Sequence, residues 1–144
     1  MCVNDDRGKI IHRDWKRIII DFSSLRYERG ITPTDIDMAI EFNGELFIVG
    51  EIKYKDTEVK KGQRIYIQRL IDAISRGGLP AIAFVAEHDI APSMDRDIDA
   101  AMTRVREYYW KGKWRIPPHD SLVLADAIKQ IREYAFRSSP QKKT

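Results

Sequence analysis

The stretch TPTDIDMAIEFNGELFIVGEIKYK, residues 32–55, decides the fold of this chain, because it places charged residues inside two apolar segments. Asp35, Asp37, Glu51 and Lys53 lie among residues that are typical of buried β-strands. A charge inside a sheet is unfavourable unless it is paired or binds a metal ion. The stretch therefore predicts a functional site that is built into the core of the fold.

The segments Ile36–Phe42 and Leu46–Tyr54 are predicted to form the two strands of a β-hairpin. Asn43-Gly44 lies between them, and this dipeptide is the strongest short-range signal for a hairpin turn. Successive side chains of a strand point to opposite faces of the sheet. Glu51 and Lys53, two positions apart, are therefore expected to project from the same face.

The length of the turn decides whether Asp37 can reach Glu51. A two-residue turn would leave the two apolar stripes of the hairpin on opposite faces. A three-residue turn with Gly44 in the left-handed region pairs Glu41 with Glu45 and brings both stripes to one face. We expect this turn or an equivalent bulge, because burying one continuous apolar stripe has the larger effect on stability. The acids then converge on the other face.

The remaining segments predict an α/β fold with a mixed central sheet flanked by helices. Helical spacing of apolar residues over Gln63–Arg76, followed by Gly77-Gly78, predicts a helix and its end. Pro80–Glu87 is apolar throughout, as expected for a strand that is covered on both faces. Helical spacing also predicts two further C-terminal helices, over Met94–Tyr109 and Ser121–Phe136.

The length and composition indicate one globular domain. The chain has 144 residues, 43% of them hydrophobic and 33% charged, and no apolar run is long enough to span a bilayer. We expect a single domain over 1–144, with a core at roughly 15–88 and a helical extension over 94–137. One cysteine cannot form an internal disulfide, and no secretory signal is recognised, so a cytoplasmic protein without membrane association is expected.

Basic residues are clustered along the chain, although the net charge is only +3. Residues 53–69 contain six bases and two acids, and residues 104–115 contain five bases and one acid. The second cluster overlaps Trp110–Pro118, which we expect to be a basic, aromatic loop. The last sixteen residues carry five bases and one acid. Any one cluster is consistent with an ordinary solvated surface, but three clusters in a small domain favour a nucleic-acid partner.

The charged residues of the hairpin point to phosphodiester chemistry. Two or three carboxylates with no histidine or cysteine among them suit a hard cation such as Mg²⁺ or Mn²⁺. A metal ion bound in this way lowers the pKa of water and neutralises phosphate oxygens. A neighbouring lysine can hold a water molecule or stabilise developing negative charge.

At this point the sequence resembles the PD-(D/E)xK nucleases of the restriction-endonuclease-like superfamily. The resemblance rests on Asp37, on Glu51-Ile52-Lys53 fourteen positions later, on Gly62-Gln63 at the start of the next helix, and on the strand Pro80–Glu87. It covers roughly residues 31–88 and is closest to small phage and prophage nucleases. Thr34 stands before Asp35, so the literal Pro-Asp pair of the family is absent.

The resemblance implies a role for each residue of the motif. Asp37 and Glu51 would ligate a metal ion, together with the backbone carbonyl of Ile52. Lys53 would position or activate the attacking water, and Gln63 would orient this lysine or the DNA backbone. The implied cofactor is Mg²⁺, for which Mn²⁺ can substitute, and no organic cofactor is expected.

Other interpretations of these residues remain open at the level of sequence. Asp35 either joins the metal ligands or braces the Thr-Pro-Thr turn. Asp37 and Glu51 could form ion pairs within a structural domain, although such buried pairs rarely stabilise a fold. Gln63 could be an exposed residue of the first helical turn.

The sequence thus predicts a metal-dependent deoxyribonuclease directed by DNA structure or DNA ends. Its phosphate contacts are expected from the basic residues after the motif, namely Lys55, Lys60, Lys61, Arg64 and Arg69. A homodimer in the cytoplasm of a bacterial or phage-infected cell is a further expectation. The alternative is a non-catalytic DNA-binding or assembly module on the same fold.

Overall fold

The computed structural model describes residues 21–137. The chain divides into two compact units, Met1–Pro33 and Thr34–Thr144. Within the first unit, the described residues contain a short 3-10 helix, Glu28–Gly30. The start of the expected core, residues 15–20, lies outside the described residues. Every candidate site residue belongs to the second unit.

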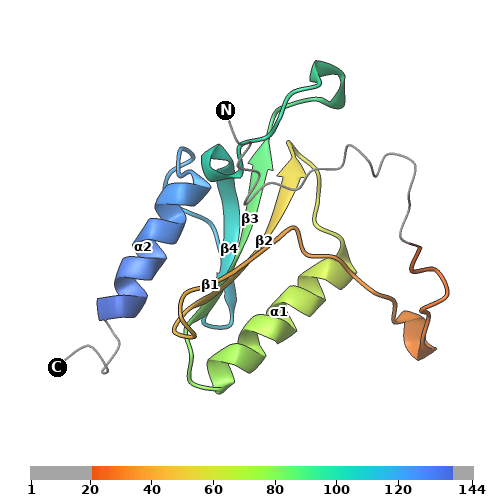
Figure 1. The fold of residues 1–144 in the computed structure, drawn as a ribbon, viewed down its shortest axis with the longest axis horizontal. Helices are drawn as coiled ribbons and strands as arrows, with labels where there is room; N and C mark the ends of the chain where they lie inside the picture. Colours follow the sequence, from red (N-terminus) through yellow and green to blue (C-terminus); the bar gives the residue numbers. More distant parts are fainter. Residues whose placement is uncertain (1–20, 138–144) are drawn as a thin grey trace, which may run out of the picture. The chain divides into compact units, whose positions relative to one another are not determined.

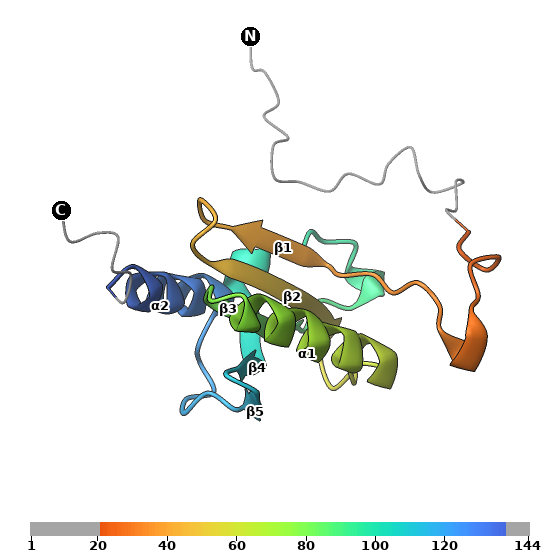
Figure 2. The ribbon, with the colours of Figure 1, turned by 90° about the horizontal axis from the view of Figure 1, so that it is seen from below.

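The second unit is a mixed five-stranded sheet with one helix packed on each face (Figures 1 and 2). Its strands lie in chain order across the sheet. They are β1 (Met38–Glu41), β2 (Phe47–Tyr54), β3 (Ala81–His88), β4 (Arg104–Trp110) and β5 (Lys113–Arg115). The helices are α1 (Lys61–Arg76) and α2 (Leu124–Arg137), and short 3-10 helices occur at Pro92–Met94 and Ala100–Met102. The sequence prediction of an α/β fold with a mixed sheet is therefore confirmed.

The strands β2 and β3 are parallel and are joined by α1, whereas the other neighbouring pairs are antiparallel. The predicted strand Leu46–Tyr54, the predicted helix Gln63–Arg76 and the predicted strand Pro80–Glu87 are all confirmed within two residues. The helix α1 ends where Gly77 donates its N–H to the carbonyls of Ala73 and Ile74.

The turn between β1 and β2 has an odd number of residues, as predicted, but it lies one residue further along. Phe42 donates its N–H to the carbonyl of Leu46, so three residues form the loop. The expected pairing of Glu41 with Glu45 is wrong, because Glu41 pairs with Phe47. The Glu41 carboxylate instead accepts the Gly44 N–H at 2.7 Å, which closes the loop and removes the like-charge pair.

The prediction of a helix over Met94–Tyr109 is wrong, because this segment contains the 3-10 helix Ala100–Met102 and then most of β4. The apolar spacing was compatible with a helix, but residues 104–110 pair with β3 instead. The expected loop Trp110–Pro118 is also corrected, since β4 and β5 form a hairpin there. Lys111 and Gly112 have φ values of 49° and 80°, which are the left-handed values that a tight two-residue hairpin turn requires.

The last predicted helix is present but begins at Leu124 rather than Ser121. The preceding residues are tied to the start of β4, because Val105 donates to the Leu122 carbonyl and Leu124 donates to the Thr103 carbonyl. Up to residue 137, where the description of the chain ends, the C-terminal part therefore has one α-helix instead of the two expected. Among residues 21–137, no helix has the length and apolar composition needed to cross a membrane.

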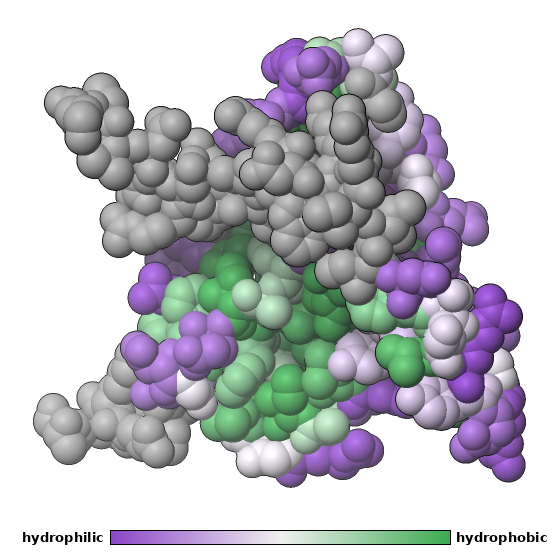
Figure 3. Space-filling view, turned by 45° about the vertical axis from the view of Figure 1, so that its right-hand side comes forward, coloured by the Kyte–Doolittle hydropathy of each residue, from purple (hydrophilic) through white to green (hydrophobic). Residues whose placement is uncertain are grey.

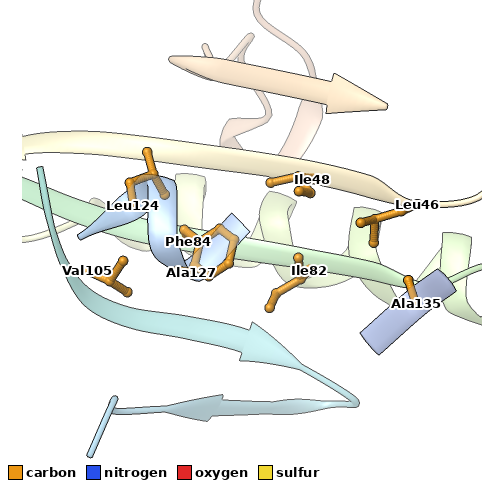
Figure 4. Packing of buried hydrophobic residues seen from close by; sticks show 8 residues of the cluster. All are labelled: Leu46, Ile48, Ile82, Phe84, Val105, Leu124, Ala127 and Ala135. Carbon is orange, nitrogen blue, oxygen red and sulfur yellow. The ribbon is translucent and has the colours of Figure 1, made fainter. Parts of the chain in front are cut away.

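Each face of the sheet has its own apolar cluster. The α2 face buries eight residues, which Figure 4 shows converging between the sheet and the helix: Leu46, Ile48, Ile82, Phe84, Val105, Leu124, Ala127 and Ala135. The α1 face buries Val49, Ile67, Ile71, Ala81, Ala83 and Tyr109. Other apolar side chains are only partly covered, and Figure 3 shows hydrophobic residues gathered in the middle of one face with hydrophilic residues around them.

Candidate active site

The predicted site residues lie at one end of the α1 face of the sheet. Val49 belongs to the apolar cluster under α1, so the alternating side chains of Glu51 and Lys53 follow it on the same face. Gln63 lies in the first turn of α1 and is buried. The sheet and the helix that packs on it therefore bring these side chains together.

Glu51 is the most unusual residue of the site. It is only 1% exposed, and neither of its carboxylate oxygens receives a hydrogen bond. Burial raises the pKa of Glu51 to about 8, and the nearby Asp37 carboxyl adds to this rise by hydrogen bonding and by charge repulsion. The two observations agree, because a protonated Glu51 could donate to Asp37, whereas an ionised Glu51 receives no hydrogen bond and has the Lys53 ammonium 4.0 Å away. A buried carboxylate that accepts no hydrogen bond is unfavourable unless it is protonated or binds a cation.

Asp37 lies directly before β1, and its carboxylate is anchored to β2. Its Oδ2 accepts the backbone N–H of Ile52 at 2.8 Å. Continuing the pairing of Met38 with Gly50 places Asp37 opposite Glu51. The prediction that the turn brings Asp37 and Glu51 together is therefore confirmed by the structure.

A chain of polar contacts links Lys53 to Asp35 through Gln63. The Lys53 Nζ donates to Gln63 Oε1 at 3.3 Å, and Gln63 Nε2 donates to Asp35 Oδ1 at 3.2 Å. The Lys53 Nζ also lies 4.0 Å from Glu51 Oε2. Gln63 thus holds the lysine beside the buried carboxylate, and Asp35 holds Gln63. The alternative that Gln63 is an exposed first-turn residue is wrong, because it is 9% exposed.

The basic residues expected to contact DNA fall into two groups. Lys55, Lys60, Lys61 and Arg69 are exposed. Arg64 is engaged within the fold, because its guanidinium forms an ion pair with Glu107 at 2.5 Å and lies 4.3 Å from the centre of the Trp114 ring. Arg64 therefore helps to fix α1 on the sheet, while its contact with DNA stays a prediction.

Sequence reasoning missed a second charged group on the same face. Glu87 of β3 is the partner of Lys53 in the parallel register, and it forms ion pairs with Arg104 and Arg106 of β4. Arg104 and Arg106 fall within the segment that was expected to be helical, whereas Glu87 ends the predicted strand Pro80–Glu87. The turn residues Lys111-Gly112 were the signal that could have revealed a strand there.

A pocket of about 590 Å³ opens at the ends of β2 and β3. Its wall includes Lys55, Glu87, His88 and Arg104, together with residues of the loop between β3 and β4. Lys55 and Glu87 each lie next to the site, so the pocket adjoins it. The charged side chains around it have both signs.

The site offers few groups that could ligate a metal ion. Within residues 21–137, no group of three or more His, Cys, Asp or Glu side chains is arranged to hold a metal ion. Asp37 and Glu51 are a pair of carboxylates, and Ile52 between Glu51 and Lys53 supplies backbone groups. The Glu51 oxygens are the observation that fits a cation, because they are buried without a hydrogen-bond donor and the Lys53 ammonium comes no closer than 4.0 Å to Oε2.

No family model, curated protein or solved structure was found to match this chain. The site is therefore described by its own residues: a buried carboxylate, a second carboxylate opposite it, and a lysine held by a glutamine.

Proposed function

We propose that this chain is a divalent-metal-dependent nuclease that hydrolyses DNA phosphodiester bonds on a restriction-endonuclease-like core. The single observation that carries the proposal is Glu51, a fully buried carboxylate whose oxygens have no donor. A carboxylate buried without a hydrogen-bond donor is costly to stability. The Lys53 ammonium lies 4.0 Å away, too far to donate a hydrogen bond, so we attribute the buried Glu51 carboxylate to a bound cation. Perturbed acids in such surroundings are typical of functional sites.

The metal ligands in this proposal are Asp37, Glu51 and the backbone carbonyl of Ile52. Oxygen donors of this kind suit Mg²⁺, or Mn²⁺ in its place. Asp35 is the weaker candidate, because its carboxylate already accepts a hydrogen bond from Gln63. Asp35 therefore acts mainly by holding Gln63 in place.

A bound divalent ion supplies Lewis acidity and lowers the pKa of a coordinated water. The protein side chains position the water and the phosphate. The Lys53 ammonium lies 4.0 Å from Glu51 Oε2, where it can hold a water molecule by hydrogen bonding and offset negative charge on a phosphate. Gln63 fixes the direction of this ammonium group through a hydrogen bond.

The exposed bases near the site support a polyanionic substrate. Lys55 follows β2 directly, and Lys60 and Lys61 lie at the start of α1. Such lysines contact the phosphate backbone and carry no sequence information. We therefore propose cutting that is directed by DNA structure or DNA ends, by a monomer or homodimer in the cytoplasm of a bacterial or phage-infected cell.

A cleavage assay of the wild type and Glu51→Ala tests the proposal. Linear, circular, single-stranded and branched DNA would each be incubated with Mg²⁺, with Mn²⁺ and with a chelator. We expect cleavage by the wild type that needs the metal and is lost in Glu51→Ala. A folded wild type that binds DNA equally with metal or chelator, and never cuts it, would instead support the non-catalytic DNA-binding module.

A further inference from the structure

The pairing of β3 with β4 contains a β-bulge beside the candidate site. Val85 pairs with Glu107, but the next residue of β3, Ala86, pairs with Val105. Arg106 is therefore an extra residue with no partner on β3. Bulges of this kind bend a strand locally and change the direction in which a side chain points, and they are frequent next to active sites.

The bulge changes the face to which Arg106 points. Val105 belongs to the apolar cluster under α2, and Tyr109 belongs to the cluster under α1. By regular alternation from Tyr109, Arg106 would lie on the α2 face. Its guanidinium instead contacts Glu87, which follows Ala81 and Ala83 on the α1 face. Arg106 thus reaches the same face as Glu51 and Lys53.

Arg106 then connects the sheet to the loop that precedes α1. Its Nε and Nη2 donate to Glu87 Oε2 at 3.2 and 3.0 Å, while Nη1 donates to the Thr57 carbonyl at 2.6 Å. Thr57 lies in the loop 55–60 between β2 and α1. This loop joins the strand that carries Glu51 and Lys53 to the helix that carries Gln63.

We propose that Arg106 is a positioning residue of the candidate active site: it fixes the loop 55–60 and so places Gln63 between Lys53 and Asp35. The planar guanidinium can bond the carboxylate and the carbonyl at once, which the point charge of a lysine cannot do in the same geometry. The inference rests on the proposed nuclease function where it concerns catalysis. The placement of the loop can be tested without any activity.

Arg104 offers a matched control. It also forms an ion pair with Glu87, on the same strand and two residues away, but only Arg106 bonds the loop. Removing Arg104 therefore perturbs Glu87 while leaving the contact with Thr57 in place. The variants to compare are Arg106→Gln, Arg106→Lys and Arg104→Gln, and the lysine variant keeps the charge next to Glu87 if the glutamine variant does not fold.

The first readout is amide hydrogen exchange of the full chain without metal or DNA. In both Arg106 variants we expect peptides covering residues 55–63 to exchange about tenfold faster, with exchange in α2 unchanged. In Arg104→Gln we expect wild-type exchange over 55–63. Unchanged exchange in the Arg106 variants, or an equal change in Arg104→Gln, would overturn the inference.

The second readout is DNA cleavage with Mg²⁺. We expect kcat to fall about tenfold in Arg106→Lys while KM stays within about twofold, because a misplaced lysine affects the reaction more than DNA binding. Faster loop exchange with an unchanged kcat would show that the loop does not position the site, which also overturns the inference. If the wild type cuts no DNA, the proposed function fails, and hydrogen exchange alone still decides whether Arg106 places the loop.

Discussion

The two faces of the sheet differ in what they bury, although the same strands form both. The α2 face buries a continuous apolar cluster, from Leu46 at one end to Leu124 at the other (Figure 4). The α1 face is apolar only over part of its length and then carries Glu51, Gln63 and Glu87. The α2 face therefore contributes to stability through apolar burial. On the α1 face, charged and polar side chains occupy positions that could otherwise bury apolar ones.

This difference separates two roles that one sheet has to perform. Burial of apolar side chains is the main source of folding free energy, and the α2 face provides the larger of the two apolar clusters. A buried carboxylate without a donor opposes folding, so the α1 face is expected to contain residues whose removal costs function more than stability. Substitutions on the α2 face should then lower the unfolding free energy, whereas substitutions of the charged residues on the α1 face should mainly lower activity.

The largest effect on stability is expected from Phe84→Ala on the α2 face. Phe84 is 3% exposed, and truncating a buried aromatic side chain costs about 3–5 kcal/mol of unfolding free energy. Urea denaturation followed by circular dichroism would measure this cost. A loss below about 1 kcal/mol would contradict the assignment of stability to this face.

The largest effect on function is expected from Lys53→Met. Loss of a group that stabilises transition-state charge typically lowers kcat about 10²–10³-fold, while the unfolding free energy should change little. Lys55→Met is the control, because Lys55 is exposed just after the same strand and should change mainly KM. Equal losses of kcat in both variants would remove the distinction between site and surface lysines.

A pH effect on stability is expected from Glu51. Its pKa rises from 4.5 to about 8 on folding, so between these values the folded state binds more protons than the unfolded state. Without metal, stability should therefore fall as the pH rises through this window. We expect Tm to drop by roughly 5 °C between pH 5 and pH 8.

The variant Glu51→Gln isolates this effect, since its neutral side chain does not titrate. Its Tm should change less with pH than that of the wild type. Differential scanning calorimetry of both proteins in chelator would measure the difference. Identical pH profiles would show that Glu51 ionises without penalty.

The smallest effect is expected from Gln63→Leu. The substitution removes the hydrogen bonds to Lys53 and Asp35 while keeping a side chain of similar size. We expect a loss of kcat of about tenfold, equivalent to roughly one hydrogen bond. Gln68→Leu on the same helix removes contacts with Trp114 and Tyr109, away from Lys53 and Asp35, and should leave kcat unchanged. Similar losses in both variants would indicate a general weakening of α1.

Much of the site could be predicted from sequence because strand periodicity is strict. Because Glu51 and Lys53 are two positions apart on one strand, they share a face, and an odd turn brings Asp37 to that same face. The position of Asp37 directly opposite Glu51 comes from the observed register. The exact loop was not predictable, because Glu41 bonds Gly44 and moves the turn by one residue.

The wrong helix prediction and the unpredicted bulge have one physical cause, which is pairing between strands that are distant in the sequence. The spacing of Ile98, Met102, Val105 and Tyr109 fits a helix, yet hydrogen bonding to β3 selects a strand from Arg104 onward. The bulge at Arg106 has no local sequence signal, because it arises from the register between β3 and β4. Its contact with Thr57 therefore became visible only in the folded chain.

Metal binding by the wild type and Glu51→Gln, followed as a Tm shift at pH 7.5, shows whether Glu51 holds a cation. A ligand that binds only the folded state raises stability with its concentration. We predict that millimolar Mg²⁺ or Mn²⁺ raises the Tm of the wild type by several degrees and leaves that of Glu51→Gln unchanged. No shift in the wild type, or an equal shift in both proteins, would contradict the claim that Glu51 is buried to bind a cation.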